Sequence, residues 1–281
     1  MNALLLDQIK AHKGKFRVAF SMSGLAIEQF RTYAPEVLDS FRALAKTGCV
    51  EFLGETYAHS LASLIDRDEF IEQVKMHSDV IKQEFGVRPR VFRNTELIYS
   101  DSIGETVSEM GFEAMLTEGA KHILGWKSPN FIYANAKDQK LRLLLRNFKL
   151  SDDIAFRFSN KSWNEWPLTV EKYVGWLTDP NMSGDTINLF MDYETFGDRA
   201  SSISCATCPE PSLTAVHSGL RRHPRWLQSS NRLQYSTRPT PFRGLMRSVM
   251  SRPGWGTNCK TRPSRNSMPS KIRFTSSTVP I

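Results

Sequence analysis

Apolar and polar positions between residues 16 and 198 follow two alternating patterns. Short runs rich in β-branched and aromatic residues predict strands at residues 16–20, 50–54, 91–97, 112–117, 141–146 and 186–191. Between them, apolar residues spaced three and four apart predict helices at residues 26–46, 67–85, 101–110 and 168–177. Three of these helices are followed by glycine stops, and one begins with a capping box: Gly48, Gly86, Gly111, and Ser102 with Glu105.

This alternation predicts βαβ units, and therefore parallel strands that form either a closed barrel or an open doubly wound sheet. Acidic residues stand at or just past the C-terminal end of four predicted strands: Glu55, Glu96, Glu118, and the pair Asp192 and Glu194. Any one of them alone is more simply the first residue of a polar loop. Because the strand ends of a (β/α) barrel share one face, where active sites are built, the four together favour a catalytic site.

Several classes of protein are excluded by what the sequence lacks. It contains neither G-x-G-x-x-G nor G-x-x-x-x-G-K-[ST], so nucleotide-binding loops have no support. The histidines of the first 198 residues form no H-x-x-x-H or H-E-x-x-H pair, so we predict structural or substrate-facing roles for them and no metal or other cofactor: His12, His59, His77 and His122. No apolar run approaches the roughly 20 residues of a membrane span. Without a signal-peptide pattern, a cytoplasmic location is expected.

Two segments place carboxylates among aromatic and apolar residues, at residues 91–101 and 190–198. Burial beside such residues raises the pKa of a carboxyl group, whereas an arginine within reach, here Arg93, keeps a carboxylate ionised. Arg93 and Glu96 are three residues apart, so on a regular strand they point to opposite faces unless the chain bends. Glycosidases require such a pair of carboxyl groups, one as acid and one as nucleophile or stabiliser.

The same segments resemble glycoside hydrolase family 57, retaining enzymes that act on α-glucans. G-C-V-E-F-L-G-E-T-Y at residues 48–57, F-R-N-T-E-L-I-Y at 92–99 and F-M-D-Y-E-T-F-G at 190–197 are similar to that family's second, third and fourth regions. T-E-G-A-K-H-I-L-G-W at 117–126 and L-S-D-D-I-A-F-R-F-S at 150–159 resemble recurrent segments of its α-amylase-type members. The resemblance implies an incomplete (β/α)7-type barrel over residues 1–198.

By this resemblance, Glu96 is the nucleophile and Asp192 the general acid/base of a double displacement that retains configuration. A retaining mechanism predicts that the two carboxyl groups lie about 5–5.5 Å apart. The resemblance also assigns substrate binding to Glu51, although an inward-facing strand acid paired with an arginine is the alternative. Trp126 is a candidate stacking platform, with a core position as its alternative. His122 and Asp152 are candidates for binding sugar hydroxyls.

The implied function is α-amylase-like cleavage of α-1,4-glucans, with an α-glucan or maltooligosaccharide as partner and neither nucleic acid nor membrane. A 4-α-glucanotransferase or a branching enzyme would share both carboxylates. Polysaccharide deacetylases of related barrel form need a His-x-x-x-His pair that is absent here. Because the family's N-terminal His-Gln-Pro motif is missing and the match stops at Asp198, a catalytically inactive fragment is a further alternative.

Residues 199–281 differ in composition and carry the basic charge of the chain. They hold 14 of the 37 Lys and Arg but only one of the 29 Asp and Glu, which gives the tail +13 and the first 198 residues −5. Abundant Ser, Arg and Pro without sustained periodicity predict an irregular tail. Our preferred hypothesis is an out-of-frame translation. The alternatives are a disordered extension, a nucleic-acid arm with Trp226, Tyr235, Phe242 and Trp255, or a zinc site with Cys205, Cys208, Cys259 and His217 or His223.

Overall fold

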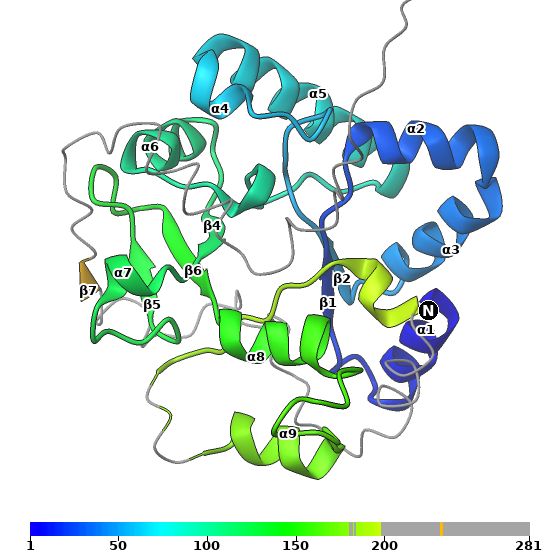
Figure 1. Ribbon diagram of the computed structural model, residues 1–281. Helices are drawn as coiled ribbons and strands as arrows, with labels where there is room; N and C mark the ends of the chain where they lie inside the picture. The colour runs from blue at the N-terminus through cyan, green and yellow to red at the C-terminus, as the bar shows by residue number, and fades with distance from the viewer. Residues whose placement is uncertain (180–181, 183, 198–230, 233–281) are drawn as a thin grey trace, which may run out of the picture. The chain divides into compact units, whose positions relative to one another are not determined.

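Short parallel strands form the centre of the protein (Figure 1). The computed structural model describes residues 1–179, 182, 184–197 and 231–232. Strand β1 (Val18–Phe20) pairs with β2 (Val50–Phe52), and β4 (Ala114–Glu118) lies between β3 (Val91–Arg93) and β6 (Arg142–Arg146). All of these pairings are parallel, as the alternation of strands and helices predicts. The carboxyl ends of the strands in each sheet therefore lie at one edge.

Two single bridges extend these strands toward a barrel. Gly54 bridges to Phe92, which connects β2 with β3, and Asn188 bridges to Arg146 at the end of β6. Within the described residues, no pairing joins the segment around Asn188 to β1, so the barrel is not closed. The architecture is thus mixed α/β with an open barrel.

The structure corrects the strand predictions. The strand predicted at residues 91–97 ends at Arg93, because the chain turns into a 3₁₀ turn at Thr95–Leu97 with left-handed backbone at Glu96. The strand predicted at residues 186–191 is reduced to the bridge at Asn188, because β5 (Ile132–Ala134) occupies the rest of the same edge of β6. The sequence pattern does not predict β5, since three residues are too few to show a period. Strand β5 runs antiparallel to β6, and β7 (Asn231–Arg232) pairs in parallel with β5.

Helices connect most strands, and local signals set their limits. Asp66 Oδ1 accepts hydrogen bonds from the backbone amides of Asp68 and Glu69, which caps α5, and Gly86 ends that helix with φ 75°. No helix in the described ranges combines the length and apolar character needed to cross a membrane. The helices are α1 (Asn2–Ala11), α2 (Gly24–Tyr33), α3 (Pro35–Ala45), α4 (Ala62–Ile65), α5 (Arg67–Phe85), α6 (Asp101–Glu109), α7 (Lys121–Leu124), α8 (Phe148–Asp152) and α9 (Val170–Leu177), with 3₁₀ turns η1 (Thr95–Leu97) and η3 (Tyr193–Gly197) and a π-helical turn η2 (Asp153–Arg157).

Two helix predictions also need correction. The single helix predicted at residues 26–46 is two helices, because Pro35 forces the preceding Ala34 out of helical conformation (φ −150°, ψ 59°). Helix α6 is capped by Ser100, whose hydroxyl accepts from the backbone amide of Ile103, and not by Ser102. Ser102 Oγ instead accepts a hydrogen bond from Lys137 at 3.1 Å.

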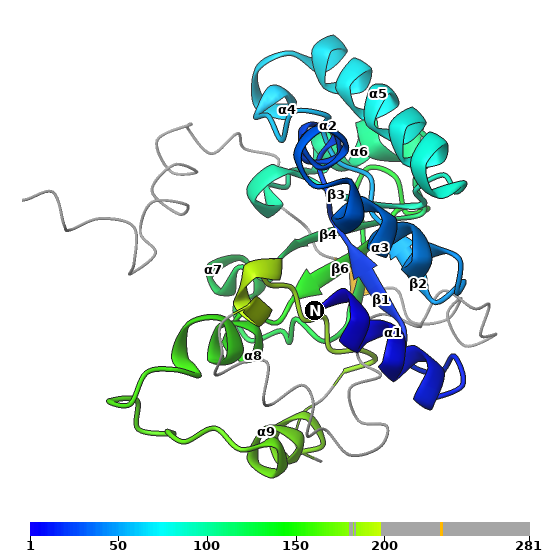
Figure 2. The ribbon, with the colours of Figure 1, turned by 90° about the vertical axis from the view of Figure 1, so that its right-hand side faces the viewer.

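Apolar side chains fill both faces of the strands. One cluster packs α1, α2, α3 and α5 against the outer face of β1 and β2 (Figure 2), with these buried residues among others: Leu5, Ile27, Leu38, Phe41, Phe52 and Ile81. A second cluster takes one residue from each of several strands and fills the interior: Leu53, Val91, Ala114 and Leu144, with Ala19 and Phe190 packed against them. Because both faces are packed, the residues that follow the strand ends start from a rigid base.

The tail predicted at residues 199–281, with its candidate zinc ligands and aromatic residues, lies outside the described residues apart from β7. The division of the chain at residue 198 therefore stays a prediction.

Candidate active site

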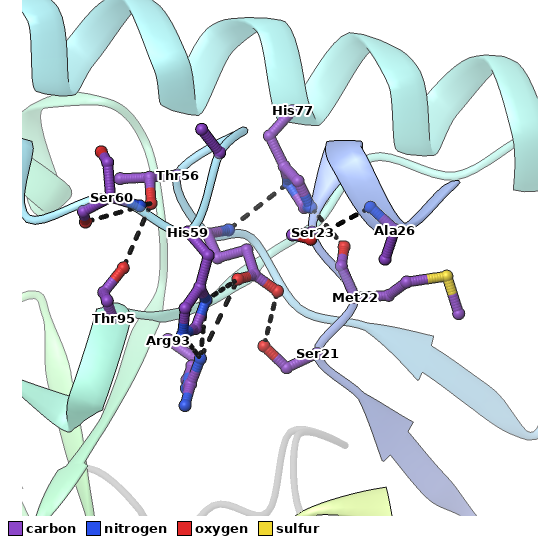
Figure 3. A network of polar contacts seen from close by, with 12 residues as sticks. Ser21, Met22, Ser23, Ala26, Thr56, His59, Ser60, His77, Arg93 and Thr95 are labelled. Atoms are coloured by element: carbon purple, nitrogen blue, oxygen red, sulfur yellow. Dashed lines mark hydrogen bonds and ion pairs between the residues drawn. The ribbon is translucent and has the colours of Figure 1, made fainter. Parts of the chain in front are cut away.

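A buried carboxylate, Glu55, organises the rim where β1, β2 and β3 end. Its side chain is almost inaccessible, at 2% exposed. Oε1 accepts a hydrogen bond from Ser21 Oγ at 2.8 Å, and Oε2 lies 2.8 Å from His59 Nδ1 and 3.9 Å from Arg93 Nη1 (Figure 3). Burial alone would raise the pKa of Glu55, but His59, Arg93 and Ser21 outweigh burial and lower this pKa below its usual value. Glu55 is therefore an ionised hydrogen-bond acceptor.

His77 of α5 supports the backbone next to Glu55. The ring is fully buried, its Nε2 lies 2.9 Å from the carbonyl oxygen of Met22, and its Nδ1 accepts from the backbone N–H of Glu55 at 3.4 Å (Figure 3). These roles require a neutral ring with its proton on Nε2. Burial also lowers the pKa of His77. His77 thus connects the loops that follow β1 and β2, and it has a structural role, one of the two predicted from the sequence.

Arg93, the last residue of β3, is the cation of the rim. Its guanidinium carbon lies 5.1 Å from the centre of the Phe190 ring, and its buried Nε has no hydrogen-bond partner. Burial lowers the pKa of Arg93, while the negative charges of Glu55, Glu96 and Asp192 act in the opposite direction. One buried cation therefore lies within electrostatic range of three carboxylates, two of which are the predicted catalytic pair.

A sharp bend brings Glu96 to the same side as Arg93. Glu96 and Leu97 both have φ 55°, a left-handed conformation that is uncommon for residues other than glycine. The bend is held by Asn94, whose side-chain amide donates to Ser63 Oγ at 2.9 Å and to the carbonyl of Ile98 at 3.0 Å. The side chain of Glu96 is 51% exposed. Strained backbone of this kind concentrates at functional positions.

Arg146 anchors the segment that carries Asp192. Its Nε donates to the carbonyl of Phe190 at 2.7 Å, Nη2 pairs with Asp152 at 2.5 Å, and Nη1 pairs with Glu118 at 3.4 Å. Asp192 itself is exposed. Beside it lies a pocket of about 210 Å³, lined by residues of η2 and of the Asp192 segment: Ile154, Ala155, Phe156, Phe158, Ser159, Asp192, Glu194 and Thr195.

The predicted substrate-binding residues are distributed over several places. Glu51 lies within electrostatic range of Arg90 and Glu113, which precede β3 and β4, and burial raises its pKa. Glu51 therefore lies toward the end of the sheet where β3 and β4 begin. Four residues of extended chain, about 13 Å, separate it from Glu55 at the opposite end. Asp152 is engaged by Arg146.

His122 lies on α7 and is exposed, and Trp126, just after α7, is 93% exposed. Trp126 is therefore available to solvent rather than buried in the core. The structure brings Glu96 and Asp192 to the electrostatic surroundings of Arg93 but leaves the ring of Trp126 with almost no protein contact.

Sequence reasoning placed Glu55 at a strand end but gave no specific role to His59 or Ser21. The ring of His59 reaches Glu55 because His59 has φ 54°, a left-handed turn residue. The available signal was the order of residues in G-E-T-Y-A-H-S, where a histidine follows a strand-end acid by four positions. That spacing alone does not distinguish a contact from a coincidence.

Comparison with known proteins gives consistent matches. The family model for glycosyl hydrolase family 57 matches residues 1–205. A protein named "Putative alpha-amylase" from Methanocaldococcus jannaschii is 48% identical over 198 residues, which are 70% of this chain and 41% of that protein. The chain therefore spans less than half the length of this relative.

Two solved structures share the fold at low identity. The 4-α-glucanotransferase from Thermococcus litoralis has a TM-score of 0.50 at 18% identity, over 62% of this chain and 26% of that one. The exo-type maltose-forming amylase from Pyrococcus sp. ST04 has a TM-score of 0.51 at 13% identity, over 69% and 34%.

Proposed function

Because the chain belongs to glycosyl hydrolase family 57, we propose that it cleaves α-1,4-glucans with retention of configuration. One observation carries the proposal: the buried Arg93 interacts electrostatically with both Glu96 and Asp192. Glycosidic cleavage needs two carboxyl groups on either side of the bond, and Arg93 lies within electrostatic range of both candidates.

In the proposed mechanism, Glu96 attacks the anomeric carbon while Asp192 protonates the glycosidic oxygen. Asp192 then removes a proton from water, which releases the sugar from Glu96. Arg93 contributes a fixed positive charge near both carboxylates. The carboxyl separation of about 5–5.5 Å that retention requires stays a prediction.

The pocket beside Asp192 is our proposed location for the leaving part of the glucan. Phe156 lines it and is 64% exposed, and a flat aromatic ring suits the apolar face of a pyranose. Asp152, fixed by Arg146, is proposed to accept a hydrogen bond from a sugar hydroxyl nearby. Trp126 and His122 are proposed to contact glucose units of the glucan farther from the bond that is cleaved, and the role of Glu51 stays a prediction.

The test uses the full 281-residue chain with maltoheptaose as substrate. We expect turnover to fall at least about 1,000-fold in Glu96→Gln and in Asp192→Asn, because each removes a group that acts on the reacting bond. Glu72→Gln, an exposed position on α5, is the matched control and should leave turnover unchanged. Turnover that is insensitive to Glu96→Gln would refute the assignment of the nucleophile.

The same reaction separates hydrolysis from transfer. Hydrolysis gives new reducing ends in proportion to bonds cleaved, whereas a 4-α-glucanotransferase gives longer maltooligosaccharides and a branching enzyme gives α-1,6 linkages. Proton NMR of the first product shows whether the α-anomer forms initially, as retention requires. A wild-type chain with a native near-ultraviolet spectrum and no turnover would contradict the proposed activity and favour the inactive alternative.

A further inference from the structure

The ring of His59 lies between two carboxylates. Its Nδ1 is 2.8 Å from Glu55 Oε2, and its Nε2 is 3.9 Å from Glu96 Oε1. The side chain is 38% exposed, so it occupies the open rim rather than the core. No other histidine of the described residues has an ion-pair contact of this kind with two carboxylates.

The orientation of this ring is fixed by its surroundings. Glu55 is buried and ionised, so it accepts the hydrogen of Nδ1 and leaves Nε2 directed toward Glu96. Arg93 Nη1 lies 3.3 Å and 3.5 Å from the two ring nitrogens, on the same network (Figure 3).

The loop that carries His59 is also tied to the turn that carries Glu96. Thr56 Oγ1 accepts from the backbone amide of Ser60 at 2.8 Å, and it lies 3.2 Å from Thr95 Oγ1 (Figure 3). Thr95 immediately precedes Glu96. A hydrogen bond between Thr56 and Thr95 therefore joins the two loops beside the contact between His59 and Glu96.

We propose that His59, in its imidazolium form with a hydrogen on each ring nitrogen, is a positioning residue for Glu96: Glu55 accepts the Nδ1 hydrogen, and the Nε2 hydrogen is directed at Glu96 Oε1, so that the other carboxylate oxygen faces the substrate. This inference rests on the proposed role of Glu96 as nucleophile. The separation of 3.9 Å is that of an ion pair rather than a hydrogen bond, so the contact orients Glu96 through charge. An orienting group of this kind acts on the rate of attack more than on binding.

The kinetic test uses the full chain with His59→Asn, Glu55→Gln and the double variant. Asparagine tolerates the left-handed backbone at this position but is too short to reach both carboxylates. We expect kcat to fall about 10- to 100-fold in His59→Asn, with KM changed less than about threefold, because misplacement of a reacting group acts on the attack.

The double variant should lose about as much as His59→Asn alone, since Glu55 acts through His59. The control is His12→Asn, a half-buried histidine at the end of α1, which should keep wild-type kcat. An unchanged kcat in His59→Asn, or losses that multiply in the double variant, would overturn the proposal.

A second measurement does not depend on turnover. In the full chain labelled with ¹⁵N-histidine, the His59 signals are assigned by their absence in His59→Asn. We expect Glu55→Gln to move the Nδ1 resonance and Glu96→Gln to move the Nε2 resonance. If Glu96→Gln leaves both nitrogens unmoved, the inference is wrong whatever the activity. If the resonances move but the wild type has no turnover, the proposed function fails instead.

Discussion

Three neighbouring donors make the burial of Glu55 energetically tolerable. An unpaired carboxylate taken out of water loses several kcal/mol of solvation free energy, whereas Ser21, His59 and Arg93 replace much of that solvation. Removing any one of these partners leaves the others with an imperfectly compensated charge. The four residues therefore stabilise their positions as a group, and single substitutions among them should not have additive effects.

At this scale, His77 predicts how stability depends on pH. Burial lowers its pKa in the folded protein below the ordinary 6.5, so the unfolded chain binds a proton more readily. The stability that the neutral His77 contributes should therefore be complete above pH 6.5. The free energy of unfolding should fall as the pH drops below 6.5, by up to about 1.4 kcal/mol per pH unit. Urea denaturation at pH 7.5, 6.5 and 5.5 measures this slope.

The comparison variant is His77→Gln, which removes the titrating ring but keeps a hydrogen-bond donor. Its stability should be lower at pH 7.5 and should change less between pH 7.5 and 5.5. His12→Gln should follow the wild-type slope. A His77→Gln slope equal to that of the wild type would show that another group controls this range. The pKa of Glu55 is also lowered, so its protonation affects the free energy of unfolding only below about pH 4.5, outside the pH range of the urea denaturation.

The sequence predicted the residues of the rim better than their contacts. Carboxylates that follow predicted strands pointed to Glu55, Glu96 and Asp192, and all three lie within electrostatic range of Arg93, although the strand predicted before Asp192 is only a bridge. The contact between His59 and Glu96 depends on left-handed conformations at both residues. Such conformations are set by surrounding hydrogen bonds, such as those of Asn94, and histidine and glutamate carry no strong preference for them.

The residues at which helices and strands begin and end also depend partly on local sequence and partly on tertiary structure. Helix α5 spans residues 67–85 and ends at Gly86 as its sequence predicts, and the Asp66 cap at its start, like the glycine stop, acts within one turn. The segment at residues 186–191 has the composition of a strand, but the edge of β6 that it would need is already occupied by β5. Strand composition reports suitability for a sheet, and only the assembled protein decides which edge is available.

Two glycines give a paired prediction at the element scale. Gly86 has φ 75° at the end of α5, and Gly175 lies inside α9, and neither would place a Cβ within 4 Å of another atom. Gly86→Ala should lower the free energy of unfolding by about 1–2 kcal/mol, because a left-handed backbone disfavours a Cβ. Gly175→Ala should raise it by about 0.5–1 kcal/mol through helix propensity.

Thermal or urea denaturation of both variants beside the wild type provides the check. Because the same methyl group is added to open space in each case, a difference in sign isolates the backbone conformation as the cause. Equal effects of the two substitutions would contradict the explanation.

Over the whole molecule, the segment after Asn188 holds the two ends of the strand arrangement together. Tyr193 packs against Phe20 and Phe41, with ring centres 5.7 Å and 6.0 Å away, and its hydroxyl donates to Asn2 Oδ1. In both ribbon views, η3 lies near α1 (Figures 1 and 2). Side-chain packing thus connects the segment of Asp192 to the first helix and strand, where the described residues show no backbone pairing.

Tyr193→Ala should therefore affect stability and turnover together. We expect a loss of about 2 kcal/mol in the free energy of unfolding, because the ring, although 41% exposed, leaves its packing against Phe20 and Phe41. Turnover should fall as well, since Asp192 is the adjacent residue. Tyr33→Ala, at an 83% exposed position, is the matched control and should change stability by less than about 0.5 kcal/mol. A Tyr193→Ala protein with wild-type stability would refute this account of how the segment is anchored.

The contact between Asn2 and Tyr193 also has a consequence for how the protein is made. The two residues are 191 positions apart in sequence. At synthesis rates of about 5–20 residues per second, roughly 10–40 s separate their appearance from the ribosome. During that interval Phe20 and Phe41 lack their contact with Tyr193, and the rim carries Glu55 and Arg93 without Asp192. The proposed catalytic groups can come together only after the segment that carries Asp192 has been synthesised, so we expect chaperones that protect exposed apolar surface to bind the nascent chain.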